Sequence, residues 1–583
     1  MTSERTDPKT LPDWYPEWAQ EFAELYFSGT TNTFILHGNT HDPVSAKKSF
    51  VTLSQFIAQH LFGQWDIVLY YDLSTGLRVT AGSDGERQRT MAATVAKAIG
   101  DLTPIGKDPS RVLHVLDRFI QKNVMAESKD RLSVALIINH ASFVASRNDR
   151  SLKAATHLVT LLNWAASPYV KRLNTAICLI DTTLGDMSER LVDNPHIASL
   201  DVPMPDWGAR LKYISSLTDW NDHEAVLKFS NYSEHQIAEL TAGMSLTDLR
   251  VLVEGSIASG RRLDEARFKE LKKTLIERQA GGLLEFLDPK WGLDMVVGHE
   301  AAKKRLKEDA SLLAQGRLQS VPMGYLLCGP VGTGKSFLAE CAAGEMGIPA
   351  VKLKNFRGGL VGQTESNLEH VLGILRSMGP VMVIVDEADA QLGSRKSSGD
   401  SGTSGRVFGM IAQQMGDTKY RGKILWMLMT ARPDYLPIDI KRQGRAEVHI
   451  PLFYPTEKKE LEQMFMVLAR KLGTEIPLGP AVPEDKLGQL SGADIEGILG
   501  RSWRNALVKG EDHIDMDDLN ACVERFIPMA QSQERLLQKY AAIIECTDEE
   551  FLPPTVRQDI EMIGGRSKIQ QHLNALKHAV DGT

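Results

Sequence analysis

The stretch GPVGTGKS, residues 329–336, has the residue types and spacing of a loop that binds a polyphosphate. Gly332 and Gly334 let the backbone turn so that successive N–H groups point at phosphate oxygens. Lys335 can reach the β- and γ-phosphates, and the hydroxyl of Ser336 can ligate Mg²⁺. An apolar run, YLLC, precedes the loop and a helical pattern follows it, which is the setting that phosphate binding at a helix start requires. The expected nucleotide contacts in this loop are Gly329, Pro330, Val331, Gly332, Thr333, Gly334, Lys335 and Ser336.

An acidic pair about fifty residues further on supplies the complementary chemistry. In VMVIVDEAD, Asp386 and Glu387 follow an apolar run that reads as a strand. The carboxyl end of a parallel strand faces the ligand in an α/β sheet. Asp386 is therefore a candidate for the magnesium shell, and Glu387 for polarising the water that attacks a γ-phosphate.

The elements that must position these residues read as α/β layers. Apolar runs alternate with amphipathic helical stretches along the whole chain, which indicates a parallel sheet with helices on both faces. The predicted strands of the first half are FILHG, DIVLYYD, SVALIIN and TAICLID, and those of the second half are GYLLCG, PAVKLKN, VMVIVDEAD and ILWMLMT.

The two halves repeat each other loosely. LDVPMPDWGARLKYISSL in the first half parallels VHIPLFYPTEKKELEQMF in the second. About forty residues later each half has a Ser-x-x-Asp start of a helix, Ser245 with Asp248 and Ser491 with Asp494, where a capping box is expected. A duplicated architecture is the interpretation we favour.

From about residue 290 to 530 the chain resembles the AAA+ ATPase family. The resemblance rests on GPVGTGKS, GLVGQTESNLEHVL, VIVDEADA, RPDYLPIDIKRQGR, SGADIEGIL and MDDLNACVERF, which follow one another in the family's order. LVGQTES and SSGDSGTSGRVFG are similar to AAA proteins encoded by cyanobacteria and algal plastids, which also have a degenerate ATPase-like first half. The resemblance implies an ATPase that uses ATP and Mg²⁺ and assembles as a homo-oligomeric ring, usually a hexamer.

It also implies further site residues. Arg442 and Arg445 match the two arginines that reach the nucleotide of a neighbouring subunit, where a guanidinium neutralises charge on the transferring phosphoryl group. Gly492 and Ala493 match the helix start beside the adenosine, and Val297 and Gly298 match the segment that contacts adenine.

The expected domains follow from these motifs. They are a degenerate ATPase-like domain with its own helical part (1–270), a linker (271–289), the large α/β nucleotide-binding domain (290–455), a small helical lid domain (456–530) and a C-terminal helical extension (531–583).

Two departures from the family pattern bear on function. Where the family has asparagine to orient water, MTARPD has Ala431, which cannot form a side-chain hydrogen bond. Thr430 is adjacent, and along a regular strand its side chain should point to the opposite face, unless a bulge or a one-residue offset turns it inward. Leu360, followed by Val361, stands where substrate-threading relatives present an aromatic residue to the ring's pore. Leucine offers less rigid contact area, although pore contact by Leu360 and Val361 remains an expectation.

The first half lacks the chemistry of the second. NTHDPV follows the strand FILHG without a lysine, and Asn139 and His140 replace the acidic pair. We expect an inert ATPase-like fold. His37, His41 and His140 are read as polar residues at strand ends rather than as metal ligands.

Composition narrows compartment and partners. The net charge of −7 gives no global attraction to nucleic acid, and no run approaches 18 apolar residues, so neither nucleic acid nor membrane is an expected partner. The N-terminus is acidic and aromatic, unlike a signal peptide. Five scattered cysteines indicate buried thiols in a reducing compartment, so a cytoplasmic protein is expected.

Three functions are compatible with these observations. We expect a slow ATP-hydrolysing ring that remodels a protein or protein complex, because Lys335, Asp386, Glu387, Arg442 and Arg445 are all present. The alternative is a scaffold that ATP assembles with little turnover, which Ala431 and Leu360 favour. A nucleic-acid motor of the same fold is disfavoured by the acidic composition.

Overall fold

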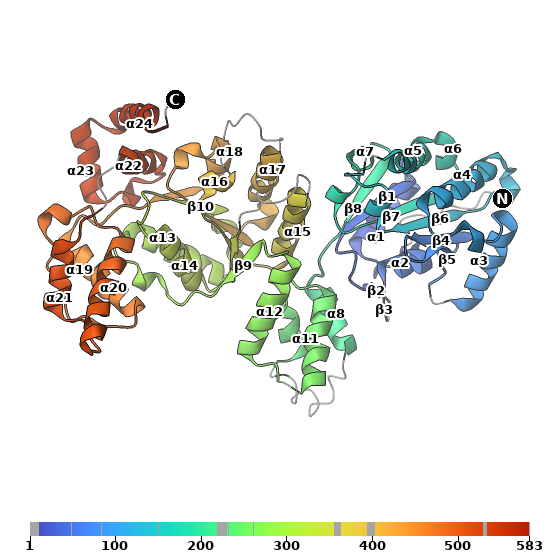
Figure 1. The fold of residues 1–583 in the computed structure, drawn as a ribbon. Helices are drawn as coiled ribbons and strands as arrows, with labels where there is room; N and C mark the ends of the chain where they lie inside the picture. The colour runs from blue at the N-terminus through green and yellow to red at the C-terminus, as the bar shows by residue number, and fades with distance from the viewer. Residues whose placement is uncertain are drawn as a thin grey trace. The chain divides into compact units, whose positions relative to one another are not determined.

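The computed structural model describes residues 11–47, 49–82, 84–149, 151–217, 230, 232–260, 262–354, 363–392, 403–528 and 533–581. They fall into two compact units (Figure 1). The first comprises residues 1–280 with 359–378, and the second comprises residues 281–358 with 379–583. The fold is mixed α/β in both units, as expected from the alternation of strand and helix patterns.

The first unit contains a six-stranded sheet. Its strands are β1 (Thr33–Gly38), β4 (Ile67–Asp72), β5 (Gly76–Val79), β6 (Val134–Asn139), β7 (Thr175–Ile180) and β8 (Ile197–Val202), in the order β5-β4-β6-β7-β1-β8. All neighbours are parallel except β4 and β5, which form an antiparallel pair at one edge. A short antiparallel hairpin, β2 (Val44–Ala46) and β3 (Ser49–Val51), follows β1.

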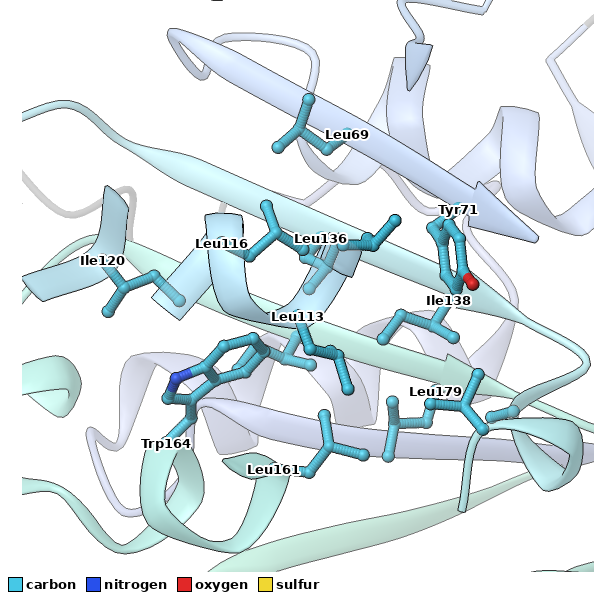
Figure 2. Packing of buried hydrophobic residues seen from close by; sticks show 14 of the residues in the cluster. Leu69, Tyr71, Leu113, Leu116, Ile120, Leu136, Ile138, Leu161, Trp164 and Leu179 are labelled. Carbon is cyan, nitrogen blue, oxygen red and sulfur yellow. The ribbon is translucent and has the colours of Figure 1, made fainter. Parts of the chain in front are cut away.

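Helices cover both faces of this sheet, which explains why its central strands β4, β6 and β7 are buried along most of their length. On one face lie α4 (Pro109–Met125) and α5 (Leu152–Ala166), and on the other α1 (Glu17–Phe27) and α2 (Leu53–Phe56). Helix α3 (Gly85–Ala98) contributes to both cores, through Val95 and Met91. Figure 2 shows Leu113 and Leu116 of α4 and Trp164 of α5 packed against the strands. Trp164 is buried and its indole N–H donates to Asp117 at 2.8 Å, so the large ring leaves no unpaired polar atom.

The remaining helices of this unit are α6 (Pro168–Lys171), α7 (Glu189–Val192), α8 (Trp207–Leu217), α10 (Glu234–Leu240), α11 (Leu246–Ser259), α12 (Glu265–Gln279) and α15 (Gln363–Ser377).

The second unit is built around a sheet of the same kind. Its strands are β9 (Leu284–Leu287), β10 (Gly324–Cys328), β11 (Ala350–Leu353), β12 (Val381–Val385), β13 (Ile424–Thr430) and β14 (Val448–Pro451), in the order β14-β10-β13-β12-β11-β9. The predicted linker 271–289 therefore contains the end of α12 and the whole of β9, which pairs antiparallel with β11. The other neighbours are parallel.

Helices surround this second sheet and extend beyond it. Those of the α/β layers are α13 (Glu300–Ala314), α14 (Lys335–Met346), α16 (Ala388–Leu392), α17 (Thr403–Gly416) and α18 (Ile438–Lys441). A separate apolar core joins the lid helices α19 (Lys458–Lys471), α20 (Gly492–Lys509) and α21 (Met516–Arg525). The C-terminal helices are α22 (Gln533–Glu545), α23 (Pro554–Ile563) and α24 (Arg566–Asp581).

The two sheets confirm the predicted duplication. In chain order, the strands β1, β4, β6, β7 and β8 occupy the same places in their sheet as β10, β11, β12, β13 and β14 do in theirs. The capping boxes differ. Ser491 and Asp494 form the full reciprocal pair at α20. At α11 the Ser245 hydroxyl accepts from the backbone N–H of Asp248. The Asp248 carboxylate there accepts hydrogen bonds from the side chains of Arg278 and Gln279.

In the first unit a carboxylate of the chain itself joins the loop after β1 to the start of α11. Asp42 is buried and accepts hydrogen bonds from the backbone N–H groups of Leu246 and Thr247 at 2.7 and 3.0 Å. The Thr247 hydroxyl and the Asn39 amide also donate to it. An anion is favoured at a helix start, where N–H groups lack intrahelical acceptors. Asp42 therefore satisfies the first N–H groups of α11 with a carboxylate of the chain itself.

We expect Asp42→Ala to loosen α11. Each buried N–H group that loses its acceptor costs about 1–3 kcal/mol, so amide hydrogen exchange over residues 245–250 should accelerate by at least about tenfold. Hydrogen exchange with mass spectrometry measures this, with Asp193→Ala at an exposed position of the same unit as the control. Unchanged exchange over 245–250 would show that Asp42 does not hold the helix.

Candidate functional site

A cavity of about 830 Å³ lies where the strand ends of the second sheet face the lid helices. That volume is within the range of small-molecule sites. The predicted site residues that line it are Val297, Gly298, Val331, Gly332, Thr333, Gly334, Lys335, Ser336, Asp386, Glu387, Gly492 and Ala493. Four segments that are far apart in sequence therefore meet at one cavity.

The phosphate-binding loop is held in a conformation that glycine permits. Gly332 and Gly334 have φ values of 83° and 86°, a region that other residues rarely adopt. A Cβ on Gly332 would lie 2.8 Å from the Cβ of Ser491, and the N–H of Gly492 donates to the Gly332 carbonyl at 3.0 Å. The start of lid helix α20 thus touches the loop directly, and no larger residue fits between them.

Lys335 lies over this loop. Its ammonium donates to the carbonyls of Gly329 and Pro330, both at 2.8 Å, so these two residues contribute through their backbone rather than by lining the cavity. Burial lowers the pKa of Lys335 to about 8, against the opposing effect of Asp386 and other acidic neighbours. The amides of the first turn of α14 have no intrahelical acceptors. A cation and orphan N–H donors around one cavity fit a polyphosphate.

The acidic pair follows β12 at the same edge. Asp386 accepts from the Glu387 N–H at 3.0 Å through Oδ1. Glu387 has an exposed side chain and a positive φ of 46°, an uncommon conformation for a residue with a Cβ. Such conformations cost about 1–3 kcal/mol and concentrate at functional sites.

Lys352 is a neighbour of this pair that sequence reasoning missed. It lies on β11, and its ammonium is 2.9 Å from Oδ2 of Asp386, with both side chains partly exposed. The register of β11 with β12, in which Lys352 faces Ile384, brings the two side chains together. The only signal in the sequence is a lysine within the apolar run PAVKL. Lys352 competes with any cation for the Asp386 carboxylate.

The strand end at the expected water-orienting position contains Thr430 and Ala431, which both line the cavity. The Thr430 hydroxyl donates to Asp389 Oδ1 at 2.6 Å and accepts from the Arg432 N–H at 2.9 Å. Its single donor is therefore engaged within the protein. Ala431 provides no side-chain donor or acceptor.

Val297 and Gly298 also line the cavity. His299, the next residue, also lines it, and burial lowers the pKa of its imidazole to about 4. Its side chain is therefore neutral at physiological pH. A Cβ on Gly298 would lie 3.2 Å from a carboxylate oxygen of Glu460. Sequence reasoning did not anticipate His299, Glu460, Met464 or Lys471 as lining residues.

Arg442 and Arg445 lie outside this cavity, after α18. The Arg442 side chain is 58% exposed and its nearest acid is Asp439, at 3.8 Å. The Arg445 side chain is only 12% exposed and donates to the backbone carbonyl of Asp439 at 2.7 Å. Burial and the charge of Arg442 lower the pKa of Arg445. Of the two, Arg442 is the one free to reach another molecule.

The remaining predictions concern the pore loop, membrane spans, metal ligands and cysteines. Leu360 and Val361, the expected pore loop, lie outside the described residues, as does most of the serine- and glycine-rich loop after Leu392. In the part of the chain that the structure describes, no helix has the length and apolar content to cross a bilayer. Within that same part, no three His, Cys, Asp or Glu side chains are grouped as metal ligands. All five cysteines are buried free thiols, as predicted.

We expect Lys352→Met to strengthen magnesium-dependent nucleotide binding. A partly exposed ion pair is worth up to about 1 kcal/mol, so the Mg²⁺ concentration for half-maximal binding should fall by up to about fivefold. Fluorescent-ATP binding titrated with Mg²⁺ measures this, and Lys354→Met, which removes the pair with Glu285 instead, is the control. A higher Mg²⁺ requirement in Lys352→Met would mean that Lys352 supports the site.

Comparison with known proteins agrees with this geometry. Residues 7–203 match the family model described as "AAA+ chaperone, N-terminal Rossmann-like domain". Residues 208–281 match "AAA+ chaperone, second helical domain", and residues 325–454 match "ATPase family associated with various cellular activities (AAA)". The three matches cover both halves of the chain, including the unit that lacks the phosphate-binding lysine.

Individual proteins that are similar to the chain also contain AAA domains or are ATP-dependent enzymes by name. The chain is 28% identical over 321 residues to the uncharacterized AAA domain-containing protein ycf46 of Trieres chinensis, which is 52% of this chain and 62% of the relative. It is 25% identical over 359 residues to ycf46 of Pyropia yezoensis, 60% of this chain and 71% of that protein. It is 30% identical over 262 residues to the ATP-dependent zinc metalloprotease FtsH of Paraburkholderia phymatum, 42% of this chain and 40% of that enzyme. The chain thus spans less than two thirds of the length of the Trieres protein and of FtsH.

The described geometry and these matches lead to one conclusion. It rests on the duplicated α/β sheets, the phosphate-binding loop with its acidic pair, and the matched AAA+ chaperone domains. The chain belongs to the AAA+ ATPase family, as a protein of the ycf46 type.

Proposed function

We propose that the protein is a slow ATPase that assembles as a homo-oligomeric ring, a hexamer, and remodels a protein or protein complex. The observation that carries this proposal is the meeting of Lys335, Asp386 and Glu387 at one cavity, while Arg442 stands exposed outside it. A site with its phosphate-binding groups in one place and its candidate arginine in another is suited to completion by a neighbouring subunit. Rings of this kind are usual among AAA+ proteins.

The residues present fit ATP and Mg²⁺. Lys335 and the first-turn amides of α14 would hold the β- and γ-phosphates, and Ser336 with Asp386 would hold the Mg²⁺ shell. Glu387 would accept a proton from the attacking water, and Arg442 of the neighbouring subunit would neutralise charge on the γ-phosphoryl group. Val297, Gly298, Gly492 and Ala493 would surround the adenosine. Mg²⁺, when bound, supplies charge neutralisation across the β- and γ-phosphate oxygens.

Two observations support slow turnover. Ala431 provides no group to orient the water, and the nearby Thr430 hydroxyl is already bonded to Asp389. The ion pair between Lys352 and Asp386 must also rearrange before that carboxylate can serve Mg²⁺. Both features equally support the second candidate, a scaffold that ATP assembles and hydrolysis only resets. We place either activity in the cytoplasm, where the buried thiols would stay reduced.

The domain division that goes with this proposal is the predicted one. Residues 290–455 bind the nucleotide, 456–530 form the lid, and 1–270 form the inert ATPase-like tier that would receive a partner. The boundary region 271–289 would join the tiers through β9, which is part of the second sheet.

Steady-state phosphate release with ATP and Mg²⁺, combined with mass determination, tests the proposal. Glu387→Gln should lose turnover but keep ATP-dependent assembly, because it removes only the proton acceptor. Arg442→Ala should lose at least about a hundredfold in turnover, since a guanidinium supplied to the phosphoryl group is worth ~10³ or more. Glu308→Gln and Arg317→Ala, both at exposed positions of the same unit, are the matched controls.

The outcomes separate the candidates. Assembly with ATP but turnover no greater than in Glu387→Gln would replace the ATPase by the scaffold. Turnover that survives Arg442→Ala would contradict completion of the site by a neighbour. Strong, salt-sensitive binding of DNA or RNA would instead favour a nucleic-acid motor of the same fold.

A further inference from the structure

We propose that the C-terminal helix α22 is a positioning element for ATP hydrolysis, which joins the phosphate-binding loop to the segment that presents Arg442. Gln538 contacts the loop and Glu545 contacts the segment, both within one unit of the chain. The inference rests on the proposed function and goes beyond it, because it gives a role to the C-terminal extension.

At the loop, α22 holds the backbone of Val331. The buried side chain of Gln538 accepts a hydrogen bond from the Val331 N–H at 3.1 Å. On the other side of the same residue, the Tyr454 hydroxyl donates to the Val331 carbonyl at 2.5 Å. The Arg535 guanidinium stacks 4.5 Å from the centre of the Tyr454 ring and donates to the carbonyl of Gln489, which belongs to the region predicted as the lid. Both polar groups of one loop residue are thus fixed from outside the loop.

At its other end, α22 holds the segment before the candidate arginine. Glu545, its last residue, forms an ion pair with Lys441, which immediately precedes Arg442. The two side chains are only 13% and 17% exposed, so removal of one partner leaves a charge that is poorly solvated. Lys441 also donates to the Pro433 carbonyl at 3.0 Å. The Glu545 backbone carbonyl is 2.9 Å from Nδ1 of His449, in β14.

The helix between these contacts is rigidly packed. Gln538 and Glu545 are two turns apart on one face, about 10 Å along the axis. Leu537, Ala541, Ala542 and Ile543 are buried between them or beside them. Arg566 closes the end of the helix by donating to the carbonyls of Ile543, Ile544 and Cys546.

The third helix of the extension adds a parallel link. Lys577 of α24 lies 3.2 Å from the buried carboxylate of Asp434, which also pairs with Arg432 after the strand end at Ala431. The extension therefore contacts the loop, the strand end and the arginine segment of its own subunit. A displacement of the loop would move α22 as a body, and with it the segment that carries Arg442 to the next site.

The test compares full-length wild-type protein with Glu545→Gln, Arg442→Ala, the double variant and Lys539→Met. Lys539→Met also removes an ion pair of α22, the one with Asp559 at 2.8 Å. That pair includes neither the Gln538 contact with the loop nor the Glu545 contact with Lys441. Turnover by phosphate release and affinity by fluorescent-ATP binding are measured for each. We expect Glu545→Gln to lower kcat on the order of tenfold to a hundredfold, since small misplacements of a catalytic group cost this much. Its ATP affinity should stay within about twofold of wild type, as should kcat of Lys539→Met.

The double variant is decisive. If Glu545 acts through Arg442, Glu545→Gln should lower kcat no further once Arg442 is alanine. An equal loss in both backgrounds, or a loss in Lys539→Met as large as in Glu545→Gln, would overturn the proposal. A general folding defect would instead show as lost ATP affinity, and Lys441→Met then tests the same pair from its other side.

A second measurement keeps this inference separate from the ATPase proposal. If the wild type shows no turnover, hydrolysis fails as a function, and hydrogen exchange over residues 438–447 decides the role of α22. Exchange should rise several-fold in Glu545→Gln and Lys441→Met but not in Lys539→Met. No rise in either pair variant would overturn the positioning role.

Discussion

The site depends on one constraint, which is that the negative charge of a bound polyphosphate must be met at a single edge of a sheet. The strand order β14-β10-β13-β12-β11 satisfies it, because the carboxyl ends of β10, β12 and β13 are neighbours there. The loop with Lys335, the acids Asp386 and Glu387, and the segment Thr430–Ala431 follow those three strands. The lid closes the cavity by direct contact of Gly492 with Gly332.

The first unit shows the same topology with a different contact at the loop after its first strand. Its strand order matches, yet the loop after β1 carries Asp42, whose carboxylate already binds the first amides of α11. In the second unit the corresponding approach of α20 to the loop is a single backbone hydrogen bond next to an open cavity. One unit is thus closed by its own side chain, and the other is arranged to be closed by a ligand.

The sequence predicted what local patterns determine. Apolar runs predicted central strands such as β10 and β12, and the helical character of the C-terminal extension was also expected. The residues around the phosphate loop follow from a motif whose spacing is fixed by phosphate geometry. Edge strand β9 was read as a linker, since four residues with mixed burial carry little signal. Lys352 beside Asp386, and Gln538 beside Val331, depend on sheet register and on a contact across 207 positions. No local pattern encodes such pairs.

A mixing experiment with Glu387→Gln and Arg442→Ala subunits tests most directly whether the site is completed between subunits. Each variant lacks a different part, so a mixed ring contains interfaces where an intact Glu387 faces an intact Arg442. The account predicts that the mixture hydrolyses ATP faster than either variant alone, and that excess of either one removes the gain. The contradicting result is a mixture whose turnover equals the average of the two separate variants, although mixed rings are shown to form. The site would then not be completed between subunits.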